Sequence, residues 1–325
     1  MFSKITFQIE NFMLYCTSRN LAKRTLASYE QTLKLFAVYL EREHQTTDFK
    51  EVGSGHIRMY VKYVQDRGKY SVVSREESRN SNHPELRGDY NKPVSATTIA
   101  NYVRNIKVFF NWFHTIEREI QKNPVGQIAL PKVERKQKHT LSESEIVLIL
   151  RQFDTTKFHG YRNWMIFRLL LDTGMRINEC VNLEPKHIDF NKRAILIVKP
   201  KNKQQRFVYF SSKLSMELKN WLKHRDRYKE SQWLFPTTKG TQLDVRNYEY
   251  ALRQAGKAIG LNVHPHQLRN NYAKYYILAG GDWFTLSRIL GHASVETTQK
   301  AYLDFTDDEV RGKAQLHSPL NTLKI

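Results

Sequence analysis

The strongest constraint on the fold of this chain is a break in helical periodicity. The run KNPVG at residues 122–126 combines a proline and a glycine, which together end a helix. The residues that follow, up to His139, are basic and typical of an extended connection between domains. Because apolar residues recur at helical spacing on both sides, we expect a domain over residues 1–124, a basic linker over 125–139 and a second domain over 140–325.

The first domain is predicted to be helical. Apolar and aromatic residues recur there at the spacing of one helix face, which indicates a single aromatic-rich core. The expected helices cover residues 4–19, 25–42, 55–67 and 95–118. Residues 68–94 are polar and aperiodic, so we expect a long exposed loop there, which is either mobile or folds against a partner.

The second domain is predicted to combine helices with one small β element. Ser142 and Glu145 have the spacing of a capping box, which predicts that a helix begins there. Strands are predicted over residues 194–198 and 207–210, with a lysine-rich turn between them. Helices are expected to about residue 153 and over residues 161–171, 177–184, 212–227, 244–258, 266–279, 282–290 and 294–302. The fold class is therefore mainly α with a small β-hairpin or sheet (α+β).

The charge of the chain favours a polyanionic partner. Its 325 residues include 52 lysines and arginines against 32 acidic residues, which gives a net charge of +20. Such an excess is most often directed at nucleic acid. Charge alone leaves two alternatives open: a basic protein without such a partner, and a basic surface that meets membrane lipids.

The cysteines and the apolar runs are typical of a cytoplasmic protein. Cys16 and Cys180 are far apart and lack CxxC spacing, so neither a disulfide scaffold nor a zinc site is indicated. We expect both to be buried, reduced thiols. The first residues lack an apolar core of signal-peptide length, and no apolar run approaches the roughly 20 residues of a membrane span, so membrane attachment is not expected.

Residues that carry chemistry gather towards the end of the sequence. His264, His266 and Arg269 lie in the run HPHQLR, His292 follows in the run LGH, and Tyr302 comes after it. A guanidinium holds a phosphate through charge-assisted hydrogen bonds, and imidazoles transfer protons near neutral pH. A phenol can act as a nucleophile that leaves a covalent intermediate. Together these groups favour a site for attack on a phosphodiester.

A second guanidinium stands earlier in the sequence. Arg176 follows Thr173 and Gly174, a pair that ends a helix and lets a turn aim the next side chain out of the packed surface. Arg176 and Arg269 can hold the non-bridging oxygens of a phosphodiester and stabilise the charge that attack places on them, without a metal ion. The sequence therefore calls for no metal and no cofactor.

The ordered set of these residues resembles a known family. The segment TGMRINE at residues 173–179, the lysine-rich turn, HQLR at 266–269, LGH at 290–292 and Tyr302 resemble the catalytic domain of the tyrosine recombinases, the phage-integrase and Xer family. The first domain is similar to the helical DNA-binding domain (core-binding, SAM-like) that precedes it in this family, by size, position and helix number. The resemblance implies a site-specific recombinase that integrates or excises a mobile element or resolves DNA dimers.

The resemblance also implies a role for each side chain. Tyr302 is expected to form a 3′-phosphotyrosine bond with one DNA strand. A lysine of the turn is expected to protonate the leaving 5′-oxygen, and Lys201, counted back from Arg206, matches the family position best. His266 fits proton transfer at the attacking phenol, and His292 fits a hydrogen-bond donor to the phosphate.

Other residues are expected to support this chemistry. Glu179 fits a brace for Arg176 or His266. A tetramer on DNA is implied by the family, and an accessory DNA-bending or directionality factor is a further candidate partner. The apolar tail is a candidate contact between protomers, through Leu320, Leu323 and Ile325. The expected DNA contacts are Lys23, Arg24, Lys136, Lys138, Lys199, Lys203 and Arg206.

Four alternatives stand beside this hypothesis. The same fold can serve as a catalytically idle DNA-binding regulator, whereas a type IB topoisomerase shares the chemistry but not the two-domain layout. A metal nuclease or DDE transposase needs clustered carboxylates, and the acidic residues at 307–309 lack partners at the expected spacing. A zinc site from His264, His266 and His292 lacks the usual HExxH or cysteine motifs.

Overall fold

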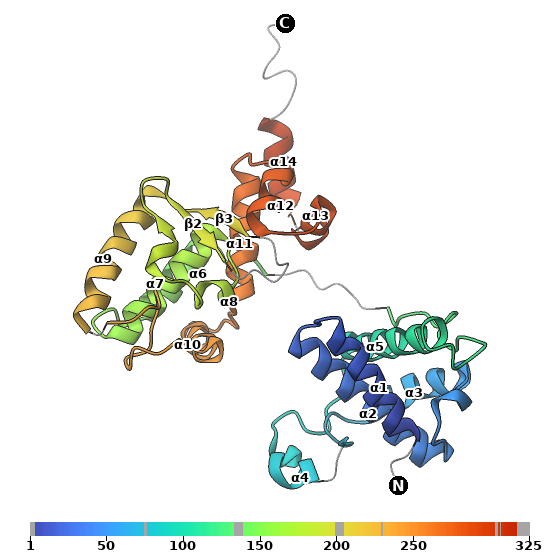
Figure 1. Cartoon of the computed structure of the whole chain (residues 1–325). Helices are drawn as coiled ribbons and strands as arrows, with labels where there is room; N and C mark the ends of the chain where they lie inside the picture. Colours follow the sequence, from blue (N-terminus) through green and yellow to red (C-terminus); the bar gives the residue numbers. More distant parts are fainter. Residues whose placement is uncertain are drawn as a thin grey trace, which may run out of the picture. The chain divides into compact units, whose positions relative to one another are not determined.

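The chain folds into two compact units, Met1–Arg135 and Lys136–Ile325. Both are mainly helical, each has its own hydrophobic core, and a three-stranded sheet belongs to the second unit. The predicted fold class is therefore confirmed. Figure 1 shows the computed structural model, which describes residues 4–74, 77–132, 139–198, 205–228, 230–302, 305 and 307–316.

The core of the N-terminal unit is aromatic, as its periodicity predicted. Rings from different helices interlock at its centre, where the ring centroids of Phe49 and Phe109 lie 4.7 Å apart. The hydroxyl of Ser95 accepts a hydrogen bond from the backbone N–H of Thr98 (3.2 Å) and so caps the last of these helices. The elements are α1 (Lys4–Ser18), α2 (Lys23–His44), η1 (Phe49–Glu51), α3 (Ser54–Asp66) and α5 (Ala96–Thr115).

The predicted loop over residues 68–94 holds more structure than its composition indicated. It contains a short helix, α4 (Glu77–Asn82), and a 3-10 turn, η2 (Pro84–Leu86). An antiparallel bridge between Gly68 and Pro93 closes its base. Backbone pairing at the two ends, and not an apolar helix face, holds this segment, which is why a search for periodicity did not detect it.

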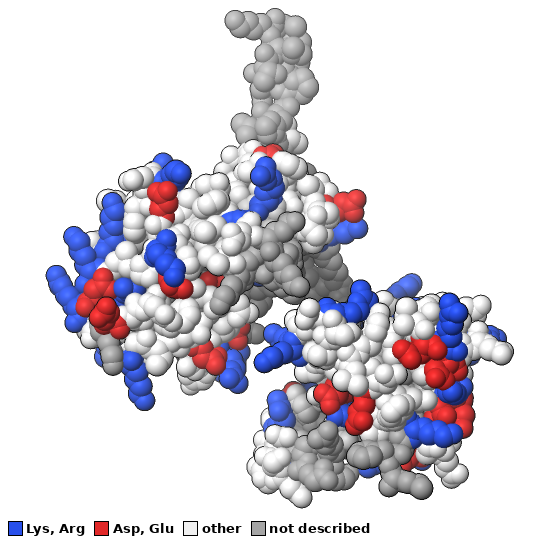
Figure 2. All heavy atoms as spheres, viewed as in Figure 1, with Lys and Arg blue, Asp and Glu red and all other residues white. Residues whose placement is uncertain are grey.

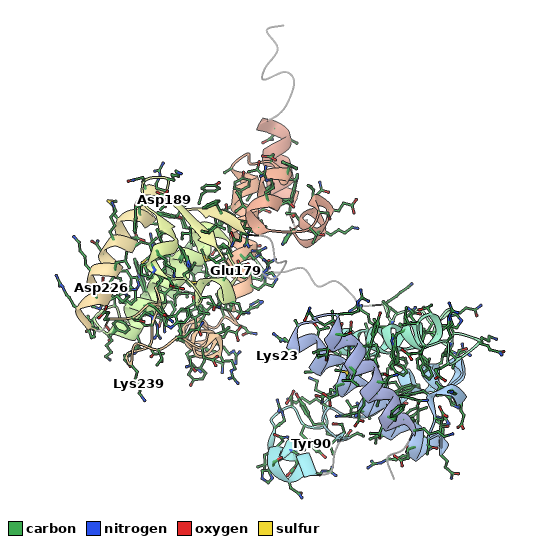
Figure 3. All side chains as sticks on the ribbon, viewed as in Figure 1. Lys23, Tyr90, Glu179, Asp189, Asp226 and Lys239 are labelled. Atoms are coloured by element: carbon green, nitrogen blue, oxygen red, sulfur yellow. The ribbon has the colours of Figure 1, made fainter. Side chains whose placement is uncertain are left out.

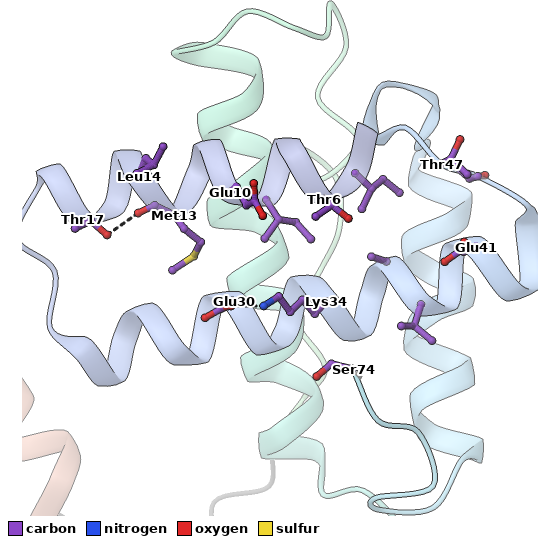
Figure 4. A pocket seen from close by; sticks show the side chains of 15 residues that line it. Thr6, Glu10, Met13, Leu14, Thr17, Glu30, Lys34, Glu41, Thr47 and Ser74 are labelled. Carbon is purple, nitrogen blue, oxygen red and sulfur yellow. Dashed lines mark hydrogen bonds and ion pairs between the residues drawn. The ribbon is translucent and has the colours of Figure 1, made fainter. Parts of the chain in front are cut away.

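A groove of about 790 Å³ runs between α1 and α2 (Figure 4). Its lining is largely apolar and includes Ile5, Ile9 and Met13. Lys34 also lines it, but its ammonium group pairs with Glu30, so its charge is already compensated. None of the residues predicted to handle a phosphate lies in this groove.

The second unit is built around α7, which packs against α11 on one side and α9 on another. Its sheet is antiparallel in the order β1-β2-β3, and β3 also contacts α7 and α12. The strands are β1 (Ile188–Asp189), β2 (Ala194–Ile197) and β3 (Arg206–Tyr209). The helices are α6 (Glu143–Arg151), α7 (Phe158–Thr173), α8 (Ile177–Cys180), η3 (Pro185–His187), α9 (Ser212–Tyr228), α10 (Val245–Lys257), α11 (Pro265–Leu278), α12 (Trp283–Leu290), α13 (Val295–Tyr302) and α14 (Asp307–Leu316).

Helix α11 carries two of the predicted site residues, and hydrogen bonds to the start of the unit fix it. Asn271 is fully buried, donates to the carbonyl of Leu141 (2.7 Å) and accepts from the backbone N–H of the same residue (3.2 Å). Gln267 donates to the carbonyl of His139 (2.9 Å). The first residues of the unit are thus anchored directly to the helix of the site.

The structure differs from the predicted elements at three places. The helix expected over 177–184 ends at Cys180, because Pro185 starts a separate 3-10 turn and a proline disfavours helical backbone before it. The strand β1 was not predicted, since two residues are too short for a period of two to be read. The polar helix α14 was not predicted either, because its sequence presents no apolar stripe.

Three further expectations can be compared with the structure. Cys16 and Cys180 are buried free thiols, as predicted, and they belong to different units. Within the described ranges, no helix is both long enough and apolar enough to cross a bilayer. The capping box predicted at Ser142 and Glu145 is present at the start of α6.

Candidate active site

Arg176 owes its position to the turn that ends α7. Gly174 is left-handed there (φ 64°), and its N–H donates to the carbonyl of Leu170 (3.0 Å). A Cβ atom on Gly174 would lie only 2.3 Å from Cδ1 of Tyr272, so only glycine lets α11 approach this closely. Arg176 then becomes the N-cap residue of α8.

Glu179, which Figure 3 labels, is a buried carboxylate. Two arginines share it. It accepts from Nη1 of Arg176 (3.1 Å) and from the backbone N–H of the same residue (2.9 Å). Arg206 donates two parallel hydrogen bonds to it, from Nη1 (2.9 Å) and Nη2 (2.8 Å). Burial by itself raises the pKa of Glu179, but the hydrogen bonds and charges of Arg206 and Arg176 outweigh it and hold the pKa below its usual value.

Arg269 is buried and connects the ends of two other helices. Its Nη1 donates to the carbonyl of Gly174 (2.7 Å), and its Nη2 donates to the carbonyl of Leu290 (2.7 Å). The same Nη2 lies 3.0 Å from Nε2 of His292. Only 2% of the residue is exposed, so these contacts determine where the guanidinium lies.

The tautomer of His292 follows from its two partners. A guanidinium only donates, so Nε2 of His292 accepts from Arg269. The ring proton is then on Nδ1, which donates to Oγ1 of Thr298 (2.8 Å). In this arrangement His292 orients Arg269. The predicted donation to a phosphate stays a prediction and requires a change of tautomer or a second proton.

The surroundings keep His292 uncharged at neutral pH. Burial lowers its pKa, and electrostatic interactions with Arg269, Arg176, His266 and Arg206 lower it further, to about 4. This list also indicates which groups lie close enough to His292 to act on it. Residues from four elements, α8, β3, α11 and the turn after α12, therefore form one positively charged neighbourhood.

His266 lies on the first turn of α11 and is exposed, whereas Arg269 on the same helix is buried. The spacing of three residues brings both towards one side of the helix, as the sequence predicted. An exposed imidazole on the surface beside a buried guanidinium suits proton transfer to or from a bound reactant.

Several predicted residues lie outside the described part of the chain. Tyr302 is the last residue of α13, and only its helical backbone is described. The three turn lysines, Lys199, Lys201 and Lys203, lie outside the described residues. The same holds for the linker residues Lys136 and Lys138 and for the tail residues Leu320, Leu323 and Ile325.

The remaining predicted DNA contacts separate into two kinds. Lys23 and Arg24 are exposed at the start of α2, where a phosphate can reach them (Figure 3 labels Lys23). The side chain of Arg206 is only 10% exposed and binds Glu179 and the carbonyl of Ile289 (2.8 Å). These contacts favour a role inside the protein for Arg206 in place of the predicted contact with DNA.

Three tyrosines on α11 lie close to the site in sequence but are poorly suited as nucleophiles. Tyr272 and Tyr276 are partly buried and pack on the core, and Tyr275 donates a hydrogen bond to the carbonyl of Leu141 (3.3 Å). Burial raises the pKa of all three phenols. Since a phenol attacks as its anion, these shifts disfavour them, in agreement with their interpretation as packing residues.

The sequence did not identify two contributors to the site. Thr298 is fully buried and fixes the tautomer of His292, but a single threonine carries no distinguishing pattern. The carbonyls of Gly174 and Leu290 hold Arg269, and backbone groups leave no trace in a sequence. Helix-ending glycines at 174 and 291 were the available signal, since each marks the turn that presents a carbonyl.

The described residues were also considered as metal ligands. Among them, no group of three or more His, Cys, Asp or Glu side chains converges as a metal site requires. The zinc alternative built on His264, His266 and His292 therefore gains no support from their geometry.

The fold and these residues define a class of enzyme. The sequence pattern of the phage integrase family matches residues 139–309, more than half of the chain, and the chain belongs to this family. It is thus a tyrosine recombinase, an enzyme of site-specific DNA recombination.

Individual relatives agree with this assignment. The tyrosine recombinase XerC of Staphylococcus aureus (strain MSSA476) is 26% identical over 300 residues, which cover 90% of either chain. The integrase of transposon Tn1549, solved with a circular-intermediate DNA, covers 96% of this chain and 99% of its own, at 17% identity and a TM-score of 0.71. XerH bound to palindromic difH covers 91% of this chain and 80% of its own, at 21% identity and a TM-score of 0.68. These structures share the fold described above.

The depressed pKa of His292 makes stability depend on pH. Between its ordinary value of 6.5 and its folded value of about 4, the unfolded chain binds a proton at this ring and the folded chain does not. The stability that the folded protein gains from keeping this ring neutral is fully present above pH 6.5 and is lost as the pH falls towards 4. We expect His292→Gln to lose less stability than the wild type between about pH 7 and about pH 4, measured by urea unfolding.

The matched control is His264→Gln, which removes an exposed imidazole outside the hydrogen-bond network and should keep the wild-type slope. Identical slopes for wild type and His292→Gln would contradict the assignment of a buried neutral imidazole.

Proposed function

We propose that Arg176 and Arg269 bind the scissile phosphate of a DNA duplex and that Tyr302 attacks it. The phenol oxygen forms a bond to phosphorus, the bond from phosphorus to the 5′-oxygen breaks, and the strand stays attached as a 3′-phosphotyrosine. His266 accepts the phenol proton, and Lys201 donates a proton to the 5′-oxygen. A 5′-hydroxyl from a second duplex then reverses these steps and rejoins the strands.

One observation carries this proposal. Two guanidiniums are fixed by hydrogen bonds inside a single positively charged neighbourhood, Arg176 through Glu179 and Arg269 through carbonyls at two helix ends. Such fixed donors stabilise negative charge as it develops on non-bridging oxygens, because they need no reorganisation during the reaction. Nothing favours the idle regulator, since every residue type that the chemistry needs is present in the sequence.

Double-stranded DNA is the substrate that fits this site and the charge of the chain. Solved structures of similar fold hold a circular-intermediate DNA in the Tn1549 integrase, difH in XerH and a core site in lambda integrase. Lys23 and Arg24 are the exposed cations of the N-terminal unit that we assign to the DNA backbone. We place Lys136, Lys138, Lys199 and Lys203 in the same group. We also propose that the reaction takes place in the cytoplasm.

The nucleophile can be tested with a nicked duplex that traps the covalent intermediate. Wild type should form a protein–DNA adduct in the presence of a metal chelator, and Tyr302→Phe should form none while still binding DNA. Tyr275→Phe removes the same hydroxyl from α11 and should keep the adduct. An adduct that persists in Tyr302→Phe would refute the assignment of the nucleophile.

The general acid can be identified by changing the leaving group. A substrate with sulfur in place of the 5′-oxygen expels a thiolate, whose low basicity removes the need for a proton. Lys201→Ala should cleave the oxygen substrate about 100-fold more slowly than wild type and recover on the sulfur substrate. Lys199→Ala and Lys203→Ala serve as controls and should show no such selective recovery. Recovery in either control instead would move the general acid to that lysine.

Exchange of strands between two duplexes requires four active sites, so we propose a tetramer on DNA, with an accessory DNA-bending or directionality factor as a further partner. The apolar tail is our candidate for the contact between protomers, through Leu320, Leu323 and Ile325. Deletion of residues 316–325 should weaken the complex that joins two duplexes, seen by native gel, and leave binding of one protomer unchanged. Full-length and shortened chains that recombine equally well would rule this role out.

A further inference from the structure

Arg206 joins three elements of the catalytic unit. It is the first residue of β3, directly after the lysine-rich turn. Its Nη1 and Nη2 bind the two oxygens of Glu179 on α8, and its Nε donates to the carbonyl of Ile289 near the end of α12 (2.8 Å). All three nitrogens of the guanidinium therefore have partners inside the protein, and a DNA phosphate is not needed to explain this residue.

The neighbouring turn is shaped to admit Arg206. Gly291 follows α12 in a left-handed conformation (φ 64°). A Cβ atom at this position would lie 2.9 Å from both Cδ and Nε of Arg206, closer than real contacts allow. The absence of a side chain at Gly291 is thus what lets the guanidinium reach the carbonyl of Ile289, just before His292.

The charges around Glu179 explain why two arginines are present. A carboxylate paired with Arg176 alone would cancel the positive charge that a phosphate requires. With Arg206 on the same carboxylate, two positive charges and one negative charge leave one positive charge. The geometry assigns the excess to Arg176, since Arg206 makes two short bonds at 10% exposure, whereas Arg176 makes one side-chain bond of 3.1 Å at 26% exposure.

We propose that Arg206 is a positioning residue for the cleavage reaction. It neutralises Glu179, so that Glu179 can fix the direction of Arg176 without consuming its charge. It also ties the start of β3 to α12 through the carbonyl of Ile289. This inference rests on the phosphate-binding role proposed above for Arg176.

The test compares Arg206→Gln with wild type on the nicked duplex. Loss of Arg206 leaves Glu179 to pair fully with Arg176, so the rate of adduct formation at saturating DNA should fall at least about tenfold. The dissociation constant for DNA should stay within about twofold, and its salt dependence should not change. Arg206→Lys keeps the positive charge but cannot make the two parallel bonds. Its rate of adduct formation should therefore lie between those of wild type and Arg206→Gln.

Two further measurements separate this role from simple support of the fold. In Glu179→Gln/Arg206→Gln the competing carboxylate is gone, so its adduct rate should exceed that of Arg206→Gln. A substrate with an uncharged methylphosphonate at the scissile position places less demand on the charge of Arg176, so the defect of Arg206→Gln should shrink on it. A misfolded site would show the same defect on both substrates.

Arg168→Gln is the matched control. Arg168 also makes two parallel bonds to a glutamate, Glu217, but on α7 and α9 outside the site. This variant should lower the melting temperature and leave the adduct rate unchanged.

Three results would overturn the inference: a wild-type adduct rate in Arg206→Gln, an equal defect on both substrates, or weaker DNA binding with a salt slope reduced by about one, as expected for a lost phosphate contact. A wild-type chain that forms no adduct at all would instead refute the proposed function, on which the inference rests.

Discussion

The active site depends most on the buried guanidinium of Arg269. It donates to the carbonyls of Gly174 and Leu290, which end α7 and α12. Carbonyls at the end of a helix have no hydrogen-bond donor within the helix, and they carry partial negative charge. A buried guanidinium supplies the donors and also compensates this charge. Arg176 follows the first of these turns and His292 follows the second. One side chain thereby sets the geometry of two others that lie far apart in the sequence.

The charges of the site are also partly compensated within the protein. Two guanidiniums pair with Glu179 and a third contacts His292, so a protonated His292 would add a further positive charge to this group. The ring stays neutral instead, with its proton on the side of Thr298 and its lone pair towards Arg269. The remaining positive excess is fixed in place by hydrogen bonds before any substrate arrives. That arrangement suits a reaction in which a singly charged phosphodiester gains negative charge in the transition state.

The sequence predicted the fold class and most helices, because these rest on periodicity, and it singled out Arg176, Glu179, Arg269 and His292, which the structure brings together. It could not predict the role of Arg206. An arginine beside a lysine-rich turn gives the same sequence pattern whether its side chain binds DNA or binds Glu179. The bonds to the carbonyls of Gly174 and Leu290 were equally hidden, because tertiary contact alone brings backbone groups to a side chain. The strand β1 escaped prediction because backbone pairing alone defines it, and the helix α8 was predicted too long because the nearby Pro185, and not periodicity, sets its end.

The net charge of +20 combines two different uses of basic residues. Several arginines of the catalytic unit are internal connections: Arg162 donates to the carbonyl of Pro236 (3.0 Å), and Arg225 donates to that of Trp233 (2.8 Å). The planar guanidinium suits this task because it offers several donors in fixed directions. Other basic side chains lie at the surface, where Figure 2 shows Lys and Arg together in blue, and along α9 the lysines Lys213, Lys219 and Lys223 are exposed.

The number of basic residues is therefore larger than the number of side chains that are free to contact DNA. Part of that number consists of arginines that hold the catalytic unit together. The lysines account for attraction to a polyanion, which is long-ranged and tolerant of position. In the function proposed above, the arginines of the site stabilise charge on the phosphate, and this stabilisation depends strongly on their position. Arg176 combines the two properties, since Glu179 fixes it from inside the protein while its side chain stays partly exposed, and this combination suits the phosphate-binding role proposed for it.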